Sequence, residues 1–113
     1  MKSIKELGFK KPTPIQSKVI PHLLGSNQDL IATAQTGTGK TAAFGLPLLQ
    51  LTDTNNDSIQ TLILCPTREL CLQIGKDLST YSKYLKNINT ISVYGGAKID
   101  KQIRSLKKGP QII

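Results

Sequence analysis

The sequence predicts an α/β fold in which a parallel β-sheet is flanked by helices. Short apolar runs alternate with amphipathic runs along the chain, which is the pattern of strands and helices that join in a parallel sheet. Turn or cap residues bound the apolar runs, as expected of interior strands in a covered sheet. With 113 residues, the chain has the size of one small domain.

The elements are expected to alternate from helix to strand along the chain. Strands are expected at residues 29–33, 61–65 and 90–94, and from residue 111 onward. Helices are expected from Thr13 and at residues 40–51, 67–85 and 98–108. The last strand is cut off as it begins, so the sheet is expected to be incomplete at its carboxyl end.

Apolar residues at spacings of three or four predict a buried face on three of these helices. In the first helix they are Ile15, Val19 and Leu23, and Pro21 is expected to kink that helix or end it early. In the helix at 67–85 they are Leu70, Ile74, Leu78, Tyr81 and Leu85. In the last helix they are Ile99, Ile103 and Leu106, which leaves the basic residues on a solvated face.

Composition narrows the class of protein. The chain has 15 Lys and Arg against 7 Asp and Glu, a net charge of +8 that suits a polyanionic partner. Cys65 and Cys71 have no second Cys/His pair for a zinc site, so we expect packed thiols in a reducing compartment. Neither a membrane span nor an apolar signal core is found, and we expect a cytoplasmic protein without a membrane partner.

The stretch AQTGTGKT, residues 34–41, predicts a phosphate-binding turn. It matches G-x-x-x-x-G-K-[ST] except that Ala34 replaces the first glycine. An apolar run precedes the stretch and a helix-forming run follows, so backbone N–H groups and the helix dipole would face an anion. Lys40 is then expected to reach the β and γ phosphates, and the Thr41 hydroxyl to bind Mg²⁺. The alternative is a glycine-rich turn without a ligand.

The segment GFKKPTPIQ, residues 8–16, has two interpretations. In the structural one, Thr13 caps a helix, Pro14 takes the first helical position and Gln16 bonds back to the cap. In the functional one, the Gln16 amide pairs with N6 and N7 of adenine, and the Phe9 ring stacks on the base. Both can hold, and no N-K-x-D guanine signature occurs. ATP is therefore the expected nucleotide.

These motifs, together with PTREL at residues 66–70 and the pair Gly95 and Gly96, resemble the amino-terminal RecA-like domain of DEAD-box RNA helicases. They correspond in order to the Q motif, motif I, motif Ia and the glycine doublet of that family. An alanine at the first position of motif I is usual there. The resemblance covers nearly the whole chain.

The resemblance implies ATP-dependent RNA binding and local strand separation by a longer protein with a second RecA-like domain. The residues implied for ATP are Phe9, Lys11, Gln16, Ala34, Gln35, Thr36, Gly37, Thr38, Gly39, Lys40 and Thr41. Lys40 and Thr41 are also implied in catalysis, and Thr41 in Mg²⁺ binding. The residues implied for RNA are Pro66, Thr67, Arg68, Gly95 and Gly96.

Two alternatives stay open. Under the helicase interpretation, this polypeptide alone is expected to be catalytically inactive, because the D-E-A-D and S-A-T motifs of the family do not occur within the 113 residues. The first alternative to that interpretation is a non-catalytic basic RNA-binding module that keeps the glycine turn as structure. A third interpretation is another P-loop ATPase, such as a DNA helicase.

Overall fold

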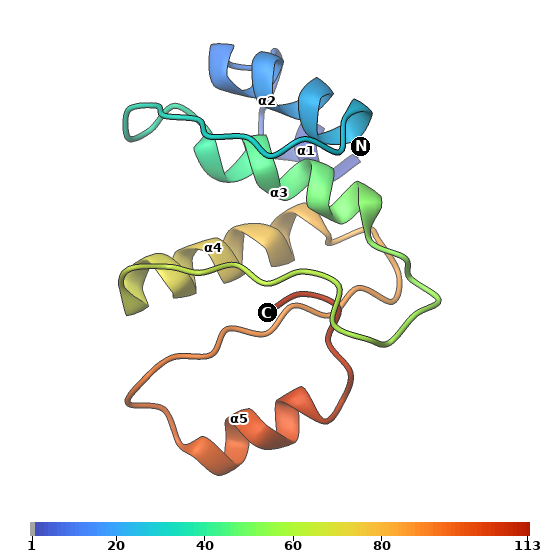
Figure 1. Cartoon of the computed structure of the whole chain (residues 1–113), viewed down its shortest axis with the longest axis vertical. Helices are drawn as coiled ribbons and strands as arrows, with labels where there is room; N and C mark the ends of the chain where they lie inside the picture. Colours follow the sequence, from blue (N-terminus) through green and yellow to red (C-terminus); the bar gives the residue numbers. More distant parts are fainter. Residues whose placement is uncertain (1) are drawn as a thin grey trace.

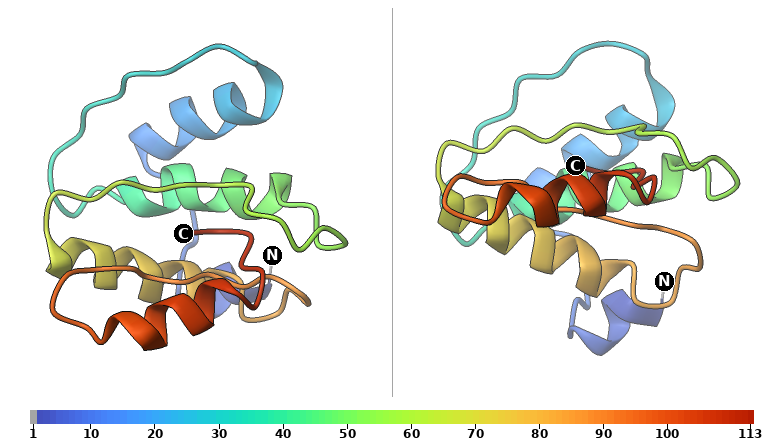
Figure 2. Two further views of the ribbon diagram at one scale, coloured as in Figure 1. Left: turned by 60° about the horizontal axis from the view of Figure 1, so that its bottom comes forward. Right: turned by 90° about the horizontal axis from the view of Figure 1, so that it is seen from below.

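The computed structural model describes residues 2–113 and contains helices joined by long extended segments (Figure 1). The helices are α1 (Lys2–Glu6), α2 (Pro14–Gly25), α3 (Lys40–Leu51), α4 (Arg68–Tyr81) and α5 (Ile99–Leu106). Helix α3 packs against both α2 and α4, and α1 packs against α4. Figure 2 shows α2, α3 and α4 stacked in this order, so α3 is the middle layer of the fold.

The predicted sheet is not formed as such, because residues 2–113 contain no continuous strand. The parallel pairing is limited to two bridges, from Thr61 to Ile112 and from Thr90 to Ile112. Ile112 lies between the segment of Thr61 and the segment of Thr90. The middle position of this sheet is therefore filled by residues 111–113 alone. The Ile63 N–H still bonds the Ile113 carbonyl at 2.8 Å, and the Ile91 N–H bonds the Ile112 carbonyl at 3.0 Å. Residues 64–65 and 92–94 then continue without a backbone partner between them. The predicted strand at 29–33 is extended but has no bridge, and Ile31 is 95% exposed.

The helix boundaries follow the sequence prediction to within two residues, apart from three larger differences. Helix α2 continues through Pro21 to Gly25, so of the two effects expected of Pro21 the early end is wrong, and the kink stays a prediction. Packing of α2 on α3 outweighs the backbone bond lost at the proline. Helix α4 ends at Tyr81 instead of Leu85, because the chain turns there and the Leu85 N–H bonds the Ser82 carbonyl at 2.7 Å. Helix α1 was not predicted at all.

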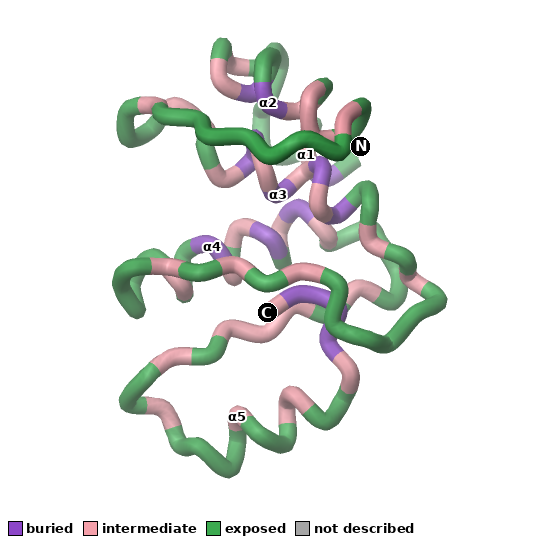
Figure 3. Tube along the Cα trace, in the orientation of Figure 1, coloured by how far each residue is buried: buried purple, intermediate pink, exposed green. Residues whose placement is uncertain are grey.

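The core lies between α3 and α4, where the two helices face each other (Figure 3). Its buried members are Ala42, Leu49, Ile74, Leu78, Tyr81 and Ile112. Gly45 brings the helices close together, since a Cβ atom there would lie 2.9 Å from Cδ2 of Leu78. This contact packs the middle of α3 against the last turn of α4.

Two predicted apolar faces are less buried than expected. Helix α5 has no buried residue, and Ile99 and Ile103 are 64% and 43% exposed, because α5 contacts no other helix of the described chain. In the face predicted for the helix at 67–85, Leu70 and Leu85 are also exposed, and Leu85 lies beyond the end of α4. Ile74, Leu78 and Tyr81 are buried. The buried face predicted for α5 is therefore wrong, and that of α4 is confirmed only from Ile74 to Tyr81.

Gln111 is a fully buried polar residue that joins three segments of the chain. Its Oε1 accepts a hydrogen bond from the Asn89 N–H at 2.9 Å. Its Nε2 donates to the carbonyls of Asn87 at 3.1 Å and Asn56 at 3.4 Å. The side chain thus satisfies backbone groups from two loops where the extended segments begin.

Candidate functional site

The glycine turn leads directly into α3. Gly37 and Gly39 both have φ of +80°, a left-handed conformation that glycine adopts at little cost. The Thr38 hydroxyl donates to the Gln35 carbonyl at 2.6 Å and closes the turn. Gly39 is the N-cap of α3, so the first N–H groups of the helix have no partner within it. Unpaired N–H groups at this end of a helix are suited to bind an anion.

Lys40 and Thr41 are the first two residues of α3. The Lys40 side chain is exposed and contributes to the wall of a cavity of about 470 Å³ between α2, α3 and residues 28–32. A lysine charge and a hydroxyl beside free backbone N–H groups fit a triphosphate with Mg²⁺, a metal that takes much of its coordination from phosphate and water. No cluster of three His, Cys, Asp or Glu side chains occurs within residues 2–113.

The start of α2 is bonded to the glycine turn. The Thr13 hydroxyl donates to the Thr38 carbonyl at 2.8 Å, and Gln16 Nε2 donates to the Gly39 carbonyl at 3.2 Å. Gln16 Oε1 accepts from the Thr13 N–H at 3.0 Å, which confirms the predicted bond back to the cap. The hydroxyl contact of Thr13 was missed because the sequence pattern indicated only a helix cap. Spacing of three places both side chains on one side of the helix start.

The two glycines of the turn have different surroundings. A Cβ atom built on Gly39 would collide with Nε2 of Gln16, which is only 5% exposed. A Cβ atom on Gly37 would meet nothing within 4 Å. Gly39 is therefore required for both conformation and space, whereas Gly37 is required for conformation alone.

Phe9 and Lys11 lie outside this hydrogen-bond network. The Phe9 ring is 40% exposed and its centroid is 6.4 Å from that of Tyr81, with the rings tilted by 54°. Lys11 is exposed and forms no hydrogen bond or ion pair with residues 2–113. Phe9 thus has free ring surface for a planar ligand, while Lys11 can only approach a ligand from solvent.

The residues implied for RNA come together at the start of α4. Thr67 is the N-cap of α4, and its hydroxyl accepts from the Leu70 N–H at 3.2 Å. The Arg68 guanidinium lies against Gly96, where φ is +94° and a Cβ atom would be 2.7 Å from Nη1. Pro66, Thr67, Arg68 and Gly95 also border a cavity of about 530 Å³, which lies between residues 62–65, residues 91–94 and α4. An exposed cation beside a helix start is a suitable site for phosphate.

Both thiols border the same cavity. Burial raises the pKa of the Cys65 thiol, and neighbouring Cys71 raises it further. The Cys71 thiol donates to the Val93 carbonyl at 3.7 Å. The two cysteines are free and partly buried, as the sequence predicted.

A glycine turn that caps a helix beginning with Lys and Thr is the arrangement typical of P-loop proteins. The family model described as DEAD/DEAH box helicase matches residues 13–113. This match covers most of the sequence, and the chain therefore belongs to the DEAD/DEAH box helicase family.

Individual relatives agree with this assignment. The chain is 50% identical over its full length to the DEAD-box ATP-dependent RNA helicase CshA of Bacillus cereus, and 46% identical to the ATP-dependent RNA helicase DeaD of Escherichia coli. It spans only 21% and 18% of those two proteins. The crystal structure of a DEAD box protein from Methanococcus jannaschii matches 98% of the chain and 30% of its own chain, with a TM-score of 0.90 and 43% identity. The chain thus matches part of the fold of a DEAD-box RecA-like domain, although residues 2–113 form no continuous strand.

None of the helices within residues 2–113 is long and apolar enough to cross a bilayer.

Proposed function

We propose that the chain is the ATP- and RNA-binding portion of an ATP-dependent DEAD-box RNA helicase that locally unwinds or remodels RNA. The observation that carries this proposal is the direct bonding of Thr13 and Gln16 to the carbonyls of Thr38 and Gly39. These bonds join the start of α2, which is suited to a base, to the glycine turn, which is suited to the phosphates. The names of the relatives, which are ATP-dependent RNA helicases, support the same function.

Residues 34–41 surround the phosphates in this proposal. Lys40 places its charge at the β and γ phosphates, and the Thr41 hydroxyl is a ligand of Mg²⁺. Phosphoryl transfer depends mainly on positioning and on charge stabilisation, so these two residues serve catalysis by holding the triphosphate. The 113-residue polypeptide has no adjacent pair of acids to orient water, and we infer that it does not turn over ATP by itself.

Gln16 has the hydrogen-bonding capacity that adenine requires. Its Nε2 carries two hydrogens, one of which is used on Gly39, and its Oε1 has two lone pairs, one of which accepts from Thr13. One donor and one acceptor are left, which match N7 and N6–H₂ of adenine. Guanine presents two acceptors, O6 and N7, at the same edge. Phe9 adds a stacking surface, and Lys11 lies in the same segment.

The proposed RNA site consists of Pro66, Thr67 and Arg68 with the turn at Gly95 and Gly96. Arg68 supplies a charge-assisted bond to a backbone phosphate, and the start of α4 supplies N–H groups. The net charge of +8 favours the approach of a polyanion. In the longer protein, which we place in the cytoplasm, a second RecA-like domain would complete the nucleotide site.

Titration of the chain with ATP and with GTP, before and after Gln16→Ala, tests the proposal. We expect tighter binding of ATP than of GTP, and loss of this preference in the variant. Equal, salt-sensitive binding of ATP, GTP and any other polyanion would contradict the proposal and would instead favour a basic binding module. Tighter binding of deoxyribose than of ribose oligonucleotides would favour a DNA-directed ATPase, because the 2′-OH distinguishes the two.

A further inference from the structure

The position of Phe9 is fixed by α1. Gly8 follows the helix with φ of +77°, and its N–H bonds the Lys5 carbonyl at 3.1 Å. The Phe9 N–H bonds the Ile4 carbonyl at 3.2 Å. These two bonds are those of a Schellman motif, which fixes the residues that follow a helix relative to its last turn. Any movement of α1 therefore moves the backbone of Phe9.

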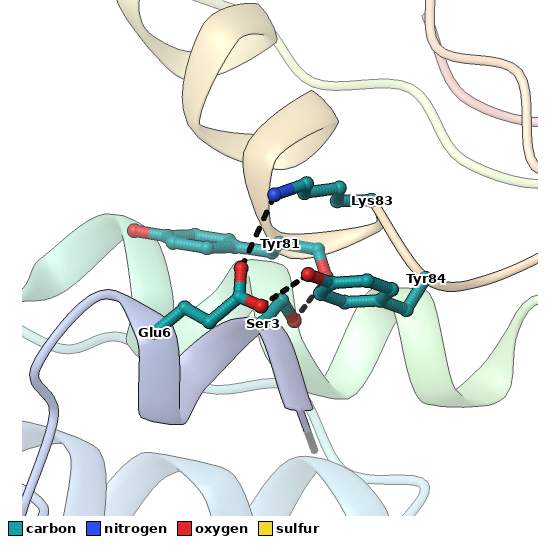
Figure 4. A network of polar contacts seen from close by, with 5 residues as sticks. All are labelled: Ser3, Glu6, Tyr81, Lys83 and Tyr84. Carbon is teal, nitrogen blue, oxygen red and sulfur yellow. Dashed lines mark hydrogen bonds and ion pairs between the residues drawn. The ribbon is translucent and has the colours of Figure 1, made fainter.

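Helix α1 is held in turn by the far end of α4 (Figure 4). The buried Ser3 hydroxyl donates to the Tyr81 carbonyl at 2.7 Å. The Glu6 carboxylate accepts from the Lys83 ammonium at 3.2 Å and also from the Tyr84 hydroxyl. We call Glu6, Lys83 and Tyr84 the α1 clamp. It joins residues that are 77 and 78 positions apart in the sequence.

The clamp and the Ser3 bond together supply the polar contacts that hold α1 against α4. A helix of five residues is far below the length at which an isolated helix is stable. Within the described chain, α1 contacts one other helix, α4. The charges reinforce this contact, because the ammonium of Lys2 lies 5.1 Å from the centroid of the Tyr84 ring. Loss of the Glu6 carboxylate would thus loosen α1, and Phe9 with it.

We propose that Glu6, Lys83 and Tyr84 are positioning residues that set the affinity for adenine by holding the Phe9 ring in place. They do so without touching the nucleotide. The proposal rests on the proposed function, in which Phe9 stacks on the base. It adds to that function a set of residues outside the motifs, at the opposite end of α4 from Arg68.

Parallel titrations with ATP and with inorganic tripolyphosphate test the proposal. Only ATP has a base, so the effect of Phe9 is confined to ATP. Base stacking on an aromatic ring is worth about five- to 150-fold in affinity, and the clamp controls part of this effect. We expect Glu6→Gln and Tyr84→Phe to weaken ATP binding by about three- to tenfold and to leave tripolyphosphate binding unchanged.

Matched variants separate positioning from general stability. Lys83→Arg retains the charge and is expected to bind ATP as the parent does, whereas Lys83→Met is expected to behave like Glu6→Gln. Asp100→Asn removes an exposed carboxylate from α5, which contacts no other helix, and is expected to change neither titration. In a Phe9→Ala background, Glu6→Gln is expected to have no further effect on ATP binding.

The outcomes distinguish this inference from the function on which it rests. If Phe9→Ala weakens ATP binding but Glu6→Gln and Tyr84→Phe do not, the positioning role is wrong and the proposed function stands. Equal weakening of ATP and tripolyphosphate by Glu6→Gln would also overturn the positioning role. If Phe9→Ala leaves ATP binding unchanged, the stacking role of Phe9 fails, and the inference fails with it.

Discussion

Replacing Gly39 by alanine is expected to destabilise the chain more than the same change at Gly37. Both glycines have φ of +80°, where alanine costs about 1–2 kcal/mol. At Gly39 the added methyl group also displaces the Gln16 amide from its bond to the Gly39 carbonyl. Leaving a buried amide unsatisfied costs about 1–3 kcal/mol. We therefore expect losses of about 2–5 kcal/mol for Gly39→Ala and about 1–2 kcal/mol for Gly37→Ala.

Urea denaturation measures both losses as changes in the free energy of unfolding. The decisive control is Gln16→Ala, which removes the amide that the new methyl group meets. In that background, the cost of Gly39→Ala is expected to fall to that of Gly37→Ala. Equal costs for the two glycine variants in the parent chain, or no fall in the Gln16→Ala background, would refute the reasoning that Gln16 occupies the space beside Gly39.

Three further predictions concern Leu78 in the core, the buried side chain of Gln111 and the α1 clamp. Leu78→Ala is expected to cost about 2–5 kcal/mol in urea denaturation, because the side chain is 1% exposed; a loss under about 1 kcal/mol would contradict the packing of α3 on α4. Gln111→Leu is expected to cost about 1–3 kcal/mol, because backbone groups of two loops lose their partner; an unchanged free energy of unfolding would refute that role. The pKa of Glu6 is lowered below 4.5, mainly by the hydrogen bond from Tyr84 and in addition by Lys83. The pKa of Lys83 is raised above 10.5, mainly by the bond to Glu6 and in addition by Tyr84. Docking of α1 should therefore be constant between these pH values. It should fail in acid once the pH falls through the lowered pKa of Glu6, and in base once the pH rises through the raised pKa of Lys83. The NMR shifts of the Phe9 ring report this docking, and a shift change near neutral pH would contradict it.

Features that depend on local sequence were predicted well. The glycine turn, the N-cap at Thr13, the start of α4 near Thr67 and the bounds of α3 follow from residues that are neighbours in the chain. Turn conformation and capping are decided over a few residues, so periodicity and residue type are sufficient to find them. The same holds for the bond of Gln16 back to its cap.

Features that depend on a distant partner were not predictable in this way. The apolar face of α5 was expected to be buried, yet burial requires an opposing surface, and the described chain offers none to this helix. Helix α1 is too short for a periodic signal, and its contacts with Lys83 and Tyr84 cross most of the sequence. The same holds for the strands, because residues 64–65 and 92–94 have strand-like sequences but no backbone partner between them.

Hydrogen exchange with and without Mg²⁺ and ATP tests most directly the claim that one nucleotide is held jointly by the glycine turn and the start of α2. We predict that ATP slows the exchange of amides at residues 35–41 and 9–16 together, and that Lys40→Ala abolishes both effects. The contrary result is slowing that is confined to the basic helix α5, or slowing at residues 35–41 without any change at residues 9–16.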